Sequence, residues 1–193
     1  MRLHLLRHGR TTANERGLYC GQTDIPVSEA GLRLLEEYKE QNIYPKDVDL
    51  FFTSGFIRPM QTIEKIYGAV EAEIIPELAE FCFGDFEMKT HGQLDKMSEY
   101  RDWLGDETGL IVCPGGESRK QFTERALKGY GILLKKAGEN VENVLLASHG
   151  GTIACIMSGV FPDIKSYYDW IPEPGRGFTL IFESGGLKGY ETI

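Results

Sequence analysis

Five side chains of the sequence are of types that can bind and transfer a phosphate group. They are two arginines, two histidines and one glutamate: Arg7, His8, Arg58, Glu80 and His149. A guanidinium presents a planar fork of donors that matches phosphate oxygens. A neutral imidazole can act as a covalent nucleophile, and a carboxylic acid can protonate a leaving oxygen and then activate water. Together these groups can carry a phosphoryl group on a histidine.

The same set of side chains can work without a metal ion. Arginines and a second imidazole can stabilise the charge of a transferring phosphoryl group, a task that Mg²⁺ performs in other phosphoryl-transfer enzymes. The sequence contains neither an HxH nor an HExxH motif, and both are spacings typical of metal sites. We therefore expect no metal site and no cofactor.

The elements that position these side chains follow from the hydrophobic pattern. Short apolar runs predict strands at residues 3–6, 48–53, 72–75, 143–148 and 177–183, with 187–190 paired to the last. Between them, helices are predicted over residues 28–40, 59–68, 92–104, 118–137 and 152–158. This alternation predicts an α/β fold with a mostly parallel central sheet and helices on both faces. Since ligands bind at the carboxyl edge of such a sheet, we expect the five side chains to converge there.

Length and composition fit a globular protein that forms a single domain over residues 1–193. A net charge of −8 argues against a nucleic-acid partner, so an anionic ligand needs a local basic pocket. The four cysteines form no CxxC pair, which favours free thiols in a reducing compartment. Because no apolar run resembles a signal peptide or a membrane span, we expect a cytoplasmic protein without a membrane partner. Either a monomer or a homodimer fits these observations.

Several motifs, in their order along the chain, resemble the histidine phosphatase superfamily, which includes the phosphoglycerate mutases. They are Leu-Arg-His-Gly at 6–9, Gly-Gln-Thr-Asp-Ile-Pro at 21–26, Thr-Ser-Gly-Phe-Ile-Arg-Pro-Met-Gln-Thr at 53–62, Leu-Ala-Glu at 78–80, Pro-Gly-Gly-Glu-Ser at 114–118 and Ser-His-Gly at 148–150. One Arg-His-Gly alone would be weak evidence. Its occurrence together with the other motifs, in the same order, is specific to this superfamily.

The resemblance implies a phosphoglycerate mutase-like fold and a role for each matching residue. His8 would be the phosphorylated nucleophile and Glu80 the acid and base. The phosphoryl oxygens would be held by Arg7, Arg58 and His149. A small phosphorylated metabolite would be the substrate, and the residues expected near it are Asn14, Gly21, Gln22, Thr23 and Gly150.

The reaction and the substrate are less closely defined than the family. Only 33 residues separate Glu80 from Pro114, whereas the cofactor-dependent mutases that this chain resembles are typically longer, with an inserted segment that closes over the substrate. A shorter segment favours a more open site and hence a phosphomonoester hydrolase, with a mutase as the alternative. The region is similar to α-ribazole phosphatases and nearly as similar to broad-specificity sugar-phosphate phosphatases. A phosphoprotein-binding scaffold is disfavoured because all five catalytic candidates are present.

The assignment of the acid rests on one of three nearby glutamates. Glu77 and Glu87 lie close to Glu80 in the sequence and are the alternatives to it. A general acid must be protonated when it acts, so burial should raise the pKa of Glu80. We therefore expect turnover to be fastest at mildly acidic pH.

Overall fold

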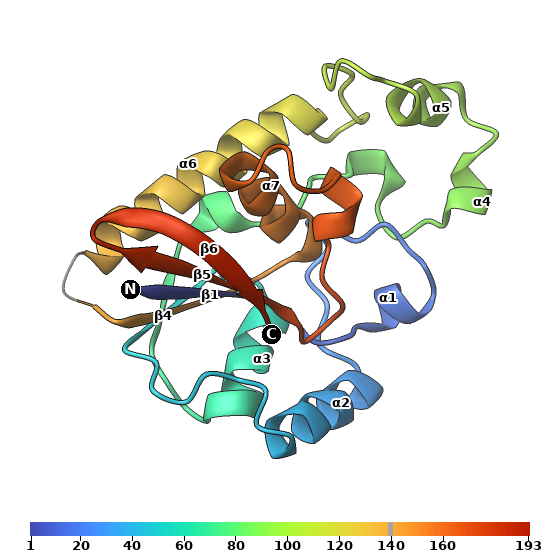
Figure 1. Cartoon of the computed structure of the whole chain (residues 1–193). Helices are drawn as coiled ribbons and strands as arrows, with labels where there is room; N and C mark the ends of the chain where they lie inside the picture. Colours follow the sequence, from blue (N-terminus) through green and yellow to red (C-terminus); the bar gives the residue numbers. More distant parts are fainter. Residues whose placement is uncertain (139–140) are drawn as a thin grey trace.

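A six-stranded sheet runs through the centre of the molecule (Figure 1). The computed structural model describes residues 1–138 and 141–193. In spatial order the strands are β3 (Ala72–Ile74), β2 (Leu50–Thr53), β4 (Asn143–Ser148), β1 (Arg2–Arg7), β5 (Gly177–Glu183) and β6 (Gly186–Thr192). The pairs β3–β2, β2–β4 and β4–β1 are parallel, whereas β1–β5 and β5–β6 are antiparallel. The sheet is thus mixed and mostly parallel, which confirms the predicted α/β class.

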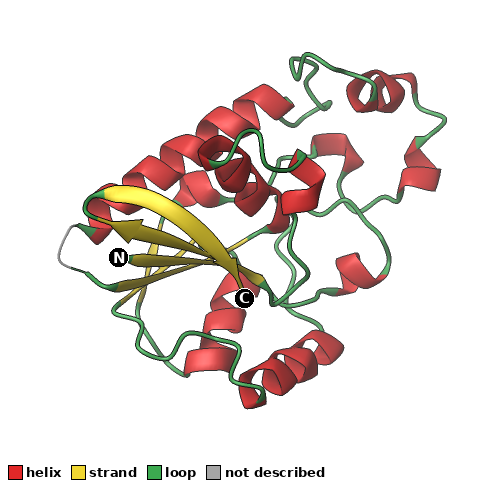
Figure 2. Cartoon of the chain, viewed as in Figure 1, coloured by secondary structure: helices red, strands yellow, loops and turns green. Residues whose placement is uncertain are grey.

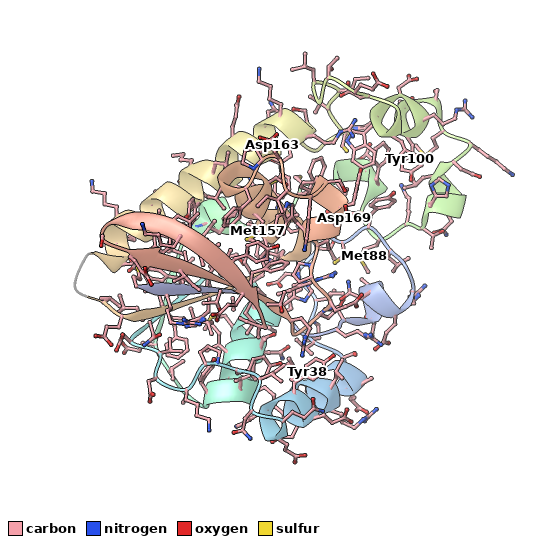
Figure 3. All side chains as sticks on the ribbon, in the orientation of Figure 1. Tyr38, Met88, Tyr100, Met157, Asp163 and Asp169 are labelled. Carbon is pink, nitrogen blue, oxygen red and sulfur yellow. The ribbon has the colours of Figure 1, made fainter. Side chains whose placement is uncertain are left out.

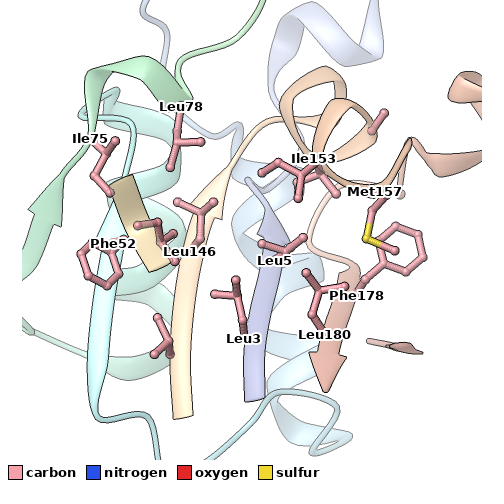
Figure 4. Packing of buried hydrophobic residues seen from close by; sticks show 14 of the residues in the cluster. Leu3, Leu5, Phe52, Ile75, Leu78, Leu146, Ile153, Met157, Phe178 and Leu180 are labelled. Carbon is pink, nitrogen blue, oxygen red and sulfur yellow. The ribbon is translucent and has the colours of Figure 1, made fainter. Parts of the chain in front are cut away.

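Helices cover both faces of this sheet (Figure 2). On one face, α6 (Arg119–Ala137) and α7 (Gly150–Val160) pack against alternate residues of the strands. Figure 4 shows Leu3, Leu5 and Leu146 on this face, with Ile153 and Met157 of α7 beside them. The other face is covered by α2 (Glu29–Glu40) and α3 (Ile57–Tyr67). Each face therefore has its own buried core, as the period-two pattern of a covered strand requires.

The register of the parallel strands brings the expected site residues to one edge. Arg7 at the end of β1 lies opposite Ser148 at the end of β4. Thr53, the last residue of β2, lies opposite Ala147. The residues that directly follow these strands therefore lie at the same edge of the sheet; they are His8, Ser54 and His149.

Some predicted element boundaries are wrong. The helix predicted over 92–104 is two short helices, α4 (His91–Leu94) and α5 (Ser98–Leu104), because Met97 has extended backbone angles and interrupts the run. The strand predicted from residue 48 begins at Leu50. α3 begins two residues before Pro59, and its first N–H group, that of Ile57, donates to the Asp24 carboxylate. Pro59 is therefore the third residue of the helix, two positions later than expected, and still lies in the first turn, where a missing N–H costs nothing.

A third group of buried side chains lies beside the sheet rather than on it. It is built from the segment between the 3₁₀ helix η2 (Gly84–Phe86) and the start of α6, and its members include Phe86, Tyr100, Trp103 and Phe122. Tyr100 lies well away from the strands in Figure 3. Phe81 also belongs to this group, which therefore borders the segment that carries Glu80. Among the described residues, no helix is both long and apolar enough to cross a membrane.

Candidate active site

His8 is the first residue after β1, and its side chain is 5% exposed. Its Nδ1 lies 2.8 Å from the carbonyl oxygen of Gly9, an arrangement in which Nδ1–H donates and Nε2 keeps its lone pair. Thr62 fixes Gly9 in turn, since the Thr62 hydroxyl accepts the Gly9 N–H at 2.8 Å. Burial, reinforced by the charges of Arg58 and Arg7, holds the pKa of His8 well below 6.5. His8 is therefore neutral at neutral pH, as a nucleophile must be.

His149 follows β4 and lies beside His8, with the two ring centroids 5.3 Å apart. Its Nε2 is 2.8 Å from the Ser54 hydroxyl, which comes from the end of β2. Within residues 1–138 and 141–193, Nδ1 of this fully buried ring has no hydrogen-bond partner. Burial and the charge of Arg58 hold the pKa of His149 well below 6.5. If Ser54 donates to Nε2, the neutral ring presents an unused Nδ1–H.

Arg58, on the first turn of α3, is almost completely buried at 1% exposure. Its Nη1 donates to the carbonyl of Thr23 at 2.9 Å, and its Nη2 donates to the carbonyl of Gly21 at 2.7 Å. Its Nε is buried without a partner in the described part of the chain. The loop carbonyls thus aim the guanidinium and leave Nε unpaired.

Glu87 holds this loop in place, a role that the sequence did not reveal. Its carboxylate accepts the N–H groups of Gly21, Gln22 and Thr23 at 2.9–3.2 Å and the Thr23 hydroxyl at 2.7 Å. A carboxylate that accepts several N–H donors is an effective anchor for an irregular loop. Glu87 therefore supports Arg58 indirectly, through the two carbonyls that bind the guanidinium.

Arg7 is the last residue of β1, and its side chain reaches the start of α7. Its Nη1 donates to the carbonyl of Pro172 at 2.6 Å, whereas its buried Nε has no partner among the described residues. A Cβ at Gly150 would lie 3.1 Å from Arg7 Nε. Arg7 thus packs directly against the first residue of α7, next to His149.

Glu80 approaches the same helix end from the irregular segment after η1 (Pro76–Leu78). Its Oε2 accepts the Gly151 N–H and its Oε1 accepts the Phe81 N–H, each at 2.8 Å. Burial raises the pKa of Glu80 above its ordinary value, although the two N–H donors and both arginines act in the opposite direction. The direction agrees with the expectation for a general acid. Glu77 instead pairs with Lys128.

Comparison with known protein families agrees with this set of side chains. The family model described as the histidine phosphatase superfamily (branch 1) matches residues 3–172. The chain belongs to this superfamily.

Individual histidine phosphatases that the chain resembles have different activities. The adenosylcobalamin/alpha-ribazole phosphatase of Escherichia coli K12 is 30% identical over 162 residues, covering 82% of this chain and 78% of that protein. The crystal structure of the alpha-ribazole phosphatase from Shigella flexneri has a TM-score of 0.83 at 26% identity, covering 97% of this chain and 93% of that one. A 2,3-bisphosphoglycerate-dependent phosphoglycerate mutase 2 of Gloeobacter violaceus is 27% identical over 166 residues, covering 80% of this chain and 73% of that protein. Membership is thus clear, whereas phosphatase and mutase activity both occur among the relatives.

The residues expected near the substrate differ in their surroundings. Gly150 lies against Arg7, and the loop of Gly21 and Thr23 contacts Arg58, as described above. Gln22 reaches the acid segment, since its Nε2 donates to the carbonyl of Glu80 at 2.7 Å. Asn14 instead caps α1 (Thr12–Glu15), where its Oδ1 accepts the backbone N–H of Thr11 at 3.0 Å. The substrate contacts of these residues stay predictions.

Two other histidines have ordinary structural partners. His4, inside β1, pairs through Nδ1 with the Thr179 hydroxyl at 2.9 Å. His91 is the first residue of α4, and its Nδ1 is 2.7 Å from the Tyr100 hydroxyl. Over the residues that the structure describes, no group of three His, Cys, Asp or Glu side chains could hold a metal ion.

Proposed function

We propose that the chain is a phosphomonoester hydrolase that works without a metal ion and passes the phosphoryl group through His8. One observation carries this proposal. In the described chain, Arg7 Nε, Arg58 Nε and His149 Nδ1 are buried without partners, and all three belong to side chains grouped around His8. Buried donors without acceptors are costly, and a phosphoryl group supplies the missing acceptors.

The first step follows from the protonation states of His8 and Glu80. The Nε2 lone pair of His8 attacks phosphorus while the bond between phosphorus and the leaving oxygen breaks. Glu80 gives its proton to that oxygen, so an alcohol departs and a phosphohistidine forms. Arg7, Arg58 and His149 bind the three phosphoryl oxygens, where charge develops.

The second step returns the enzyme to its starting state. The Glu80 carboxylate takes a proton from water, and the resulting hydroxide oxygen bonds to phosphorus. The bond between phosphorus and Nε2 breaks, which restores neutral His8 and releases inorganic phosphate. Glu80 is protonated again and ready for the next substrate.

Hydrolysis rather than transfer is favoured by the short segment that follows Glu80. Its helices α4 and α5 pack into the third hydrophobic group beside the sheet, so we expect this short segment to leave water a path to the phosphohistidine. For the substrate we propose a small phosphorylated metabolite, with α-ribazole phosphate first, because the E. coli relative carries that activity in its name. Sugar phosphates and 3-phosphoglycerate are the alternatives.

The experiment measures phosphate release from α-ribazole phosphate, sugar phosphates, 3-phosphoglycerate and p-nitrophenyl phosphate in excess EDTA. The wild type and His8→Ala are compared, and each is tested for acid-labile radiolabel after mixing with labelled substrate. Turnover in EDTA that is lost in His8→Ala supports the proposal. Wild-type turnover in His8→Ala would refute the nucleophile, and isomerisation of 3-phosphoglycerate at a rate matching hydrolysis would establish a mutase instead.

A further inference from the structure

We propose that Arg125 and Glu117 are positioning residues that hold the catalytic acid, Glu80, in place. This inference rests on the proposed role of Glu80. Neither residue belongs to the motif positions that bind phosphate, and both lie behind the acid, on the side of α6. Their effect would be exerted through the backbone that carries Glu80.

The segment that carries the acid lies outside regular secondary structure. Residues 79–83 belong to neither a helix nor a strand, so their backbone groups need partners other than a helix or sheet ladder. Side chains supply those partners. The Ser148 hydroxyl donates to the carbonyl of Leu78 at 2.8 Å, and the Thr152 hydroxyl donates to the carbonyl of Ala79 at 3.0 Å. The position of the acid therefore depends on side-chain contacts from distant parts of the chain.

Arg125 makes the largest share of these contacts. Its Nη1 donates to the carbonyls of Glu77 and Ala79, each at 2.9 Å. Its Nη2 donates to the carbonyl of Glu80 at 3.0 Å. One guanidinium thus spans three carbonyls in four consecutive residues, which fixes the path of the backbone up to the acid itself.

Glu117 completes the arrangement from the other side. Its carboxylate accepts Nη2 and Nε of Arg125 at 2.6 and 3.2 Å, and its Oε1 also accepts the Cys82 N–H at 2.8 Å. The pair therefore holds the chain both before and after Glu80. Bidentate pairing also fixes the plane of the guanidinium.

Arg125 differs from the arginines of the proposed phosphate site in how its N–H donors are paired. All five N–H donors of Arg125 have acceptors within the protein. By contrast, Arg7 and Arg58 each have a buried Nε without a partner in the described residues. Arg125 has no donor to spare for a substrate, and its function is to position the acid.

The test exploits the fact that a general acid matters most when the leaving group is poor. An alkyl phosphate needs a proton on its leaving oxygen, whereas p-nitrophenyl phosphate releases a stabilised anion and needs it far less. We would measure kcat for a glycerol phosphate and for p-nitrophenyl phosphate in wild type, Glu80→Gln, Arg125→Ala, Arg125→Lys and Glu117→Gln. The matched control is Arg119→Ala on the same helix, because Arg119 donates to the carbonyl of Trp103 and pairs with Asp106, away from the acid segment.

We expect Arg125→Ala to lower kcat about 100-fold on the alkyl phosphate and less than about tenfold on the aryl phosphate, in the pattern of Glu80→Gln. Arg125→Lys should recover little, since a point charge cannot span three carbonyls. Arg119→Ala should leave the ratio of the two rates unchanged. If Arg125→Ala fails to fold, Glu117→Gln gives the decisive ratio.

Two outcomes would overturn the inference. If Arg125→Ala lowers kcat equally on both substrates, the pair only supports the fold. If Arg119→Ala changes the ratio of the two rates as much as Arg125→Ala does, the effect is not specific to Arg125. If Glu80→Gln itself fails to distinguish the two substrates, the proposed function of Glu80 is wrong, and that failure is separate from the first two.

Discussion

A single methyl group added at Gly151 should disable the proposed catalytic acid, Glu80, without harming the fold. Gly151 lies in the first turn of α7, and its N–H is the donor that binds Glu80 Oε2. A Cβ built at this position would lie 2.4 Å from Glu80 Oε1, whereas ordinary contact begins at 3.4 Å. The carboxyl must therefore retreat by about 1 Å, and a displacement of that size at a reacting group can cost about 100-fold in rate.

The expected result of Gly151→Ala is thus a loss of about 100-fold in kcat/KM for an alkyl phosphate, or about 2.7 kcal/mol in the activation free energy. The free energy of unfolding should change by less than about 1 kcal/mol, because alanine is the better helix former and offsets part of the clash. Gly131→Ala is the matched control, since Gly131 is also helical and a Cβ there meets no atom of the described structure within 4 Å.

The assay is steady-state hydrolysis of a glycerol phosphate, with thermal unfolding of the same preparations. Gly131→Ala should keep wild-type kcat/KM. Wild-type kcat/KM in Gly151→Ala would refute the reasoning, because the acid would then tolerate a 1 Å shift or would not be Glu80. A large loss of stability in Gly151→Ala would instead mean that the clash is relieved by the backbone.

The other predictions concern the groups that hold or tune the site. Ser54→Ala removes the partner of His149 Nε2 and lets the ring proton move from Nδ1 to Nε2, so kcat/KM should fall about 10- to 100-fold. The tautomer can be read from ¹⁵N NMR of the ring. An unchanged tautomer together with full activity would contradict this role of Ser54. Glu87→Gln places an amide N–H₂ against N–H donors of the loop whose carbonyls bind Arg58. KM should therefore rise about tenfold for every phosphomonoester. A rise in KM for one substrate only would argue against this role of Glu87. Because burial raises the pKa of Glu80 and the acid acts when protonated, kcat should fall as pH increases through that raised pKa. Glu80→Gln should remove this pH dependence. A wild-type kcat that keeps increasing at alkaline pH would count against Glu80 as the acid.

The sequence predicted which side chains come together where candidate residues directly follow parallel strands; their catalytic roles stay predictions. His8 and His149 each follow directly after an apolar run, and parallel pairing of β1 with β4 is enough to bring such residues together. Glu80 was separable from Glu77 only by its motif, whereas the structure separates them by contact: Glu80 accepts the N–H of Gly151 in α7, and Glu77 pairs with Lys128.

What the sequence did not predict depends on contacts between distant irregular segments. Glu87 binds a loop more than 60 residues earlier in the chain, and Arg125 binds carbonyls 45–48 residues before it. Neither contact leaves a periodic pattern that a local reading can detect. The helix predicted over 92–104 failed for a related reason, since its apolar residues face the third hydrophobic group in two separate turns.

The unpaired donors of Arg7, Arg58 and His149 also bear on how the protein behaves between turnovers. The site holds positive charge and unused N–H groups away from bulk water, so binding of an oxyanion stabilises the folded state. In the proposed reaction free phosphate is the product, and it would satisfy the same donors as the substrate. Ligand-linked stabilisation would reach about 2.7 kcal/mol at about 100 times the dissociation constant of phosphate. The melting temperature and the steady-state rate should therefore respond to phosphate in opposite directions, which makes the enzyme most robust under the conditions in which it works most slowly.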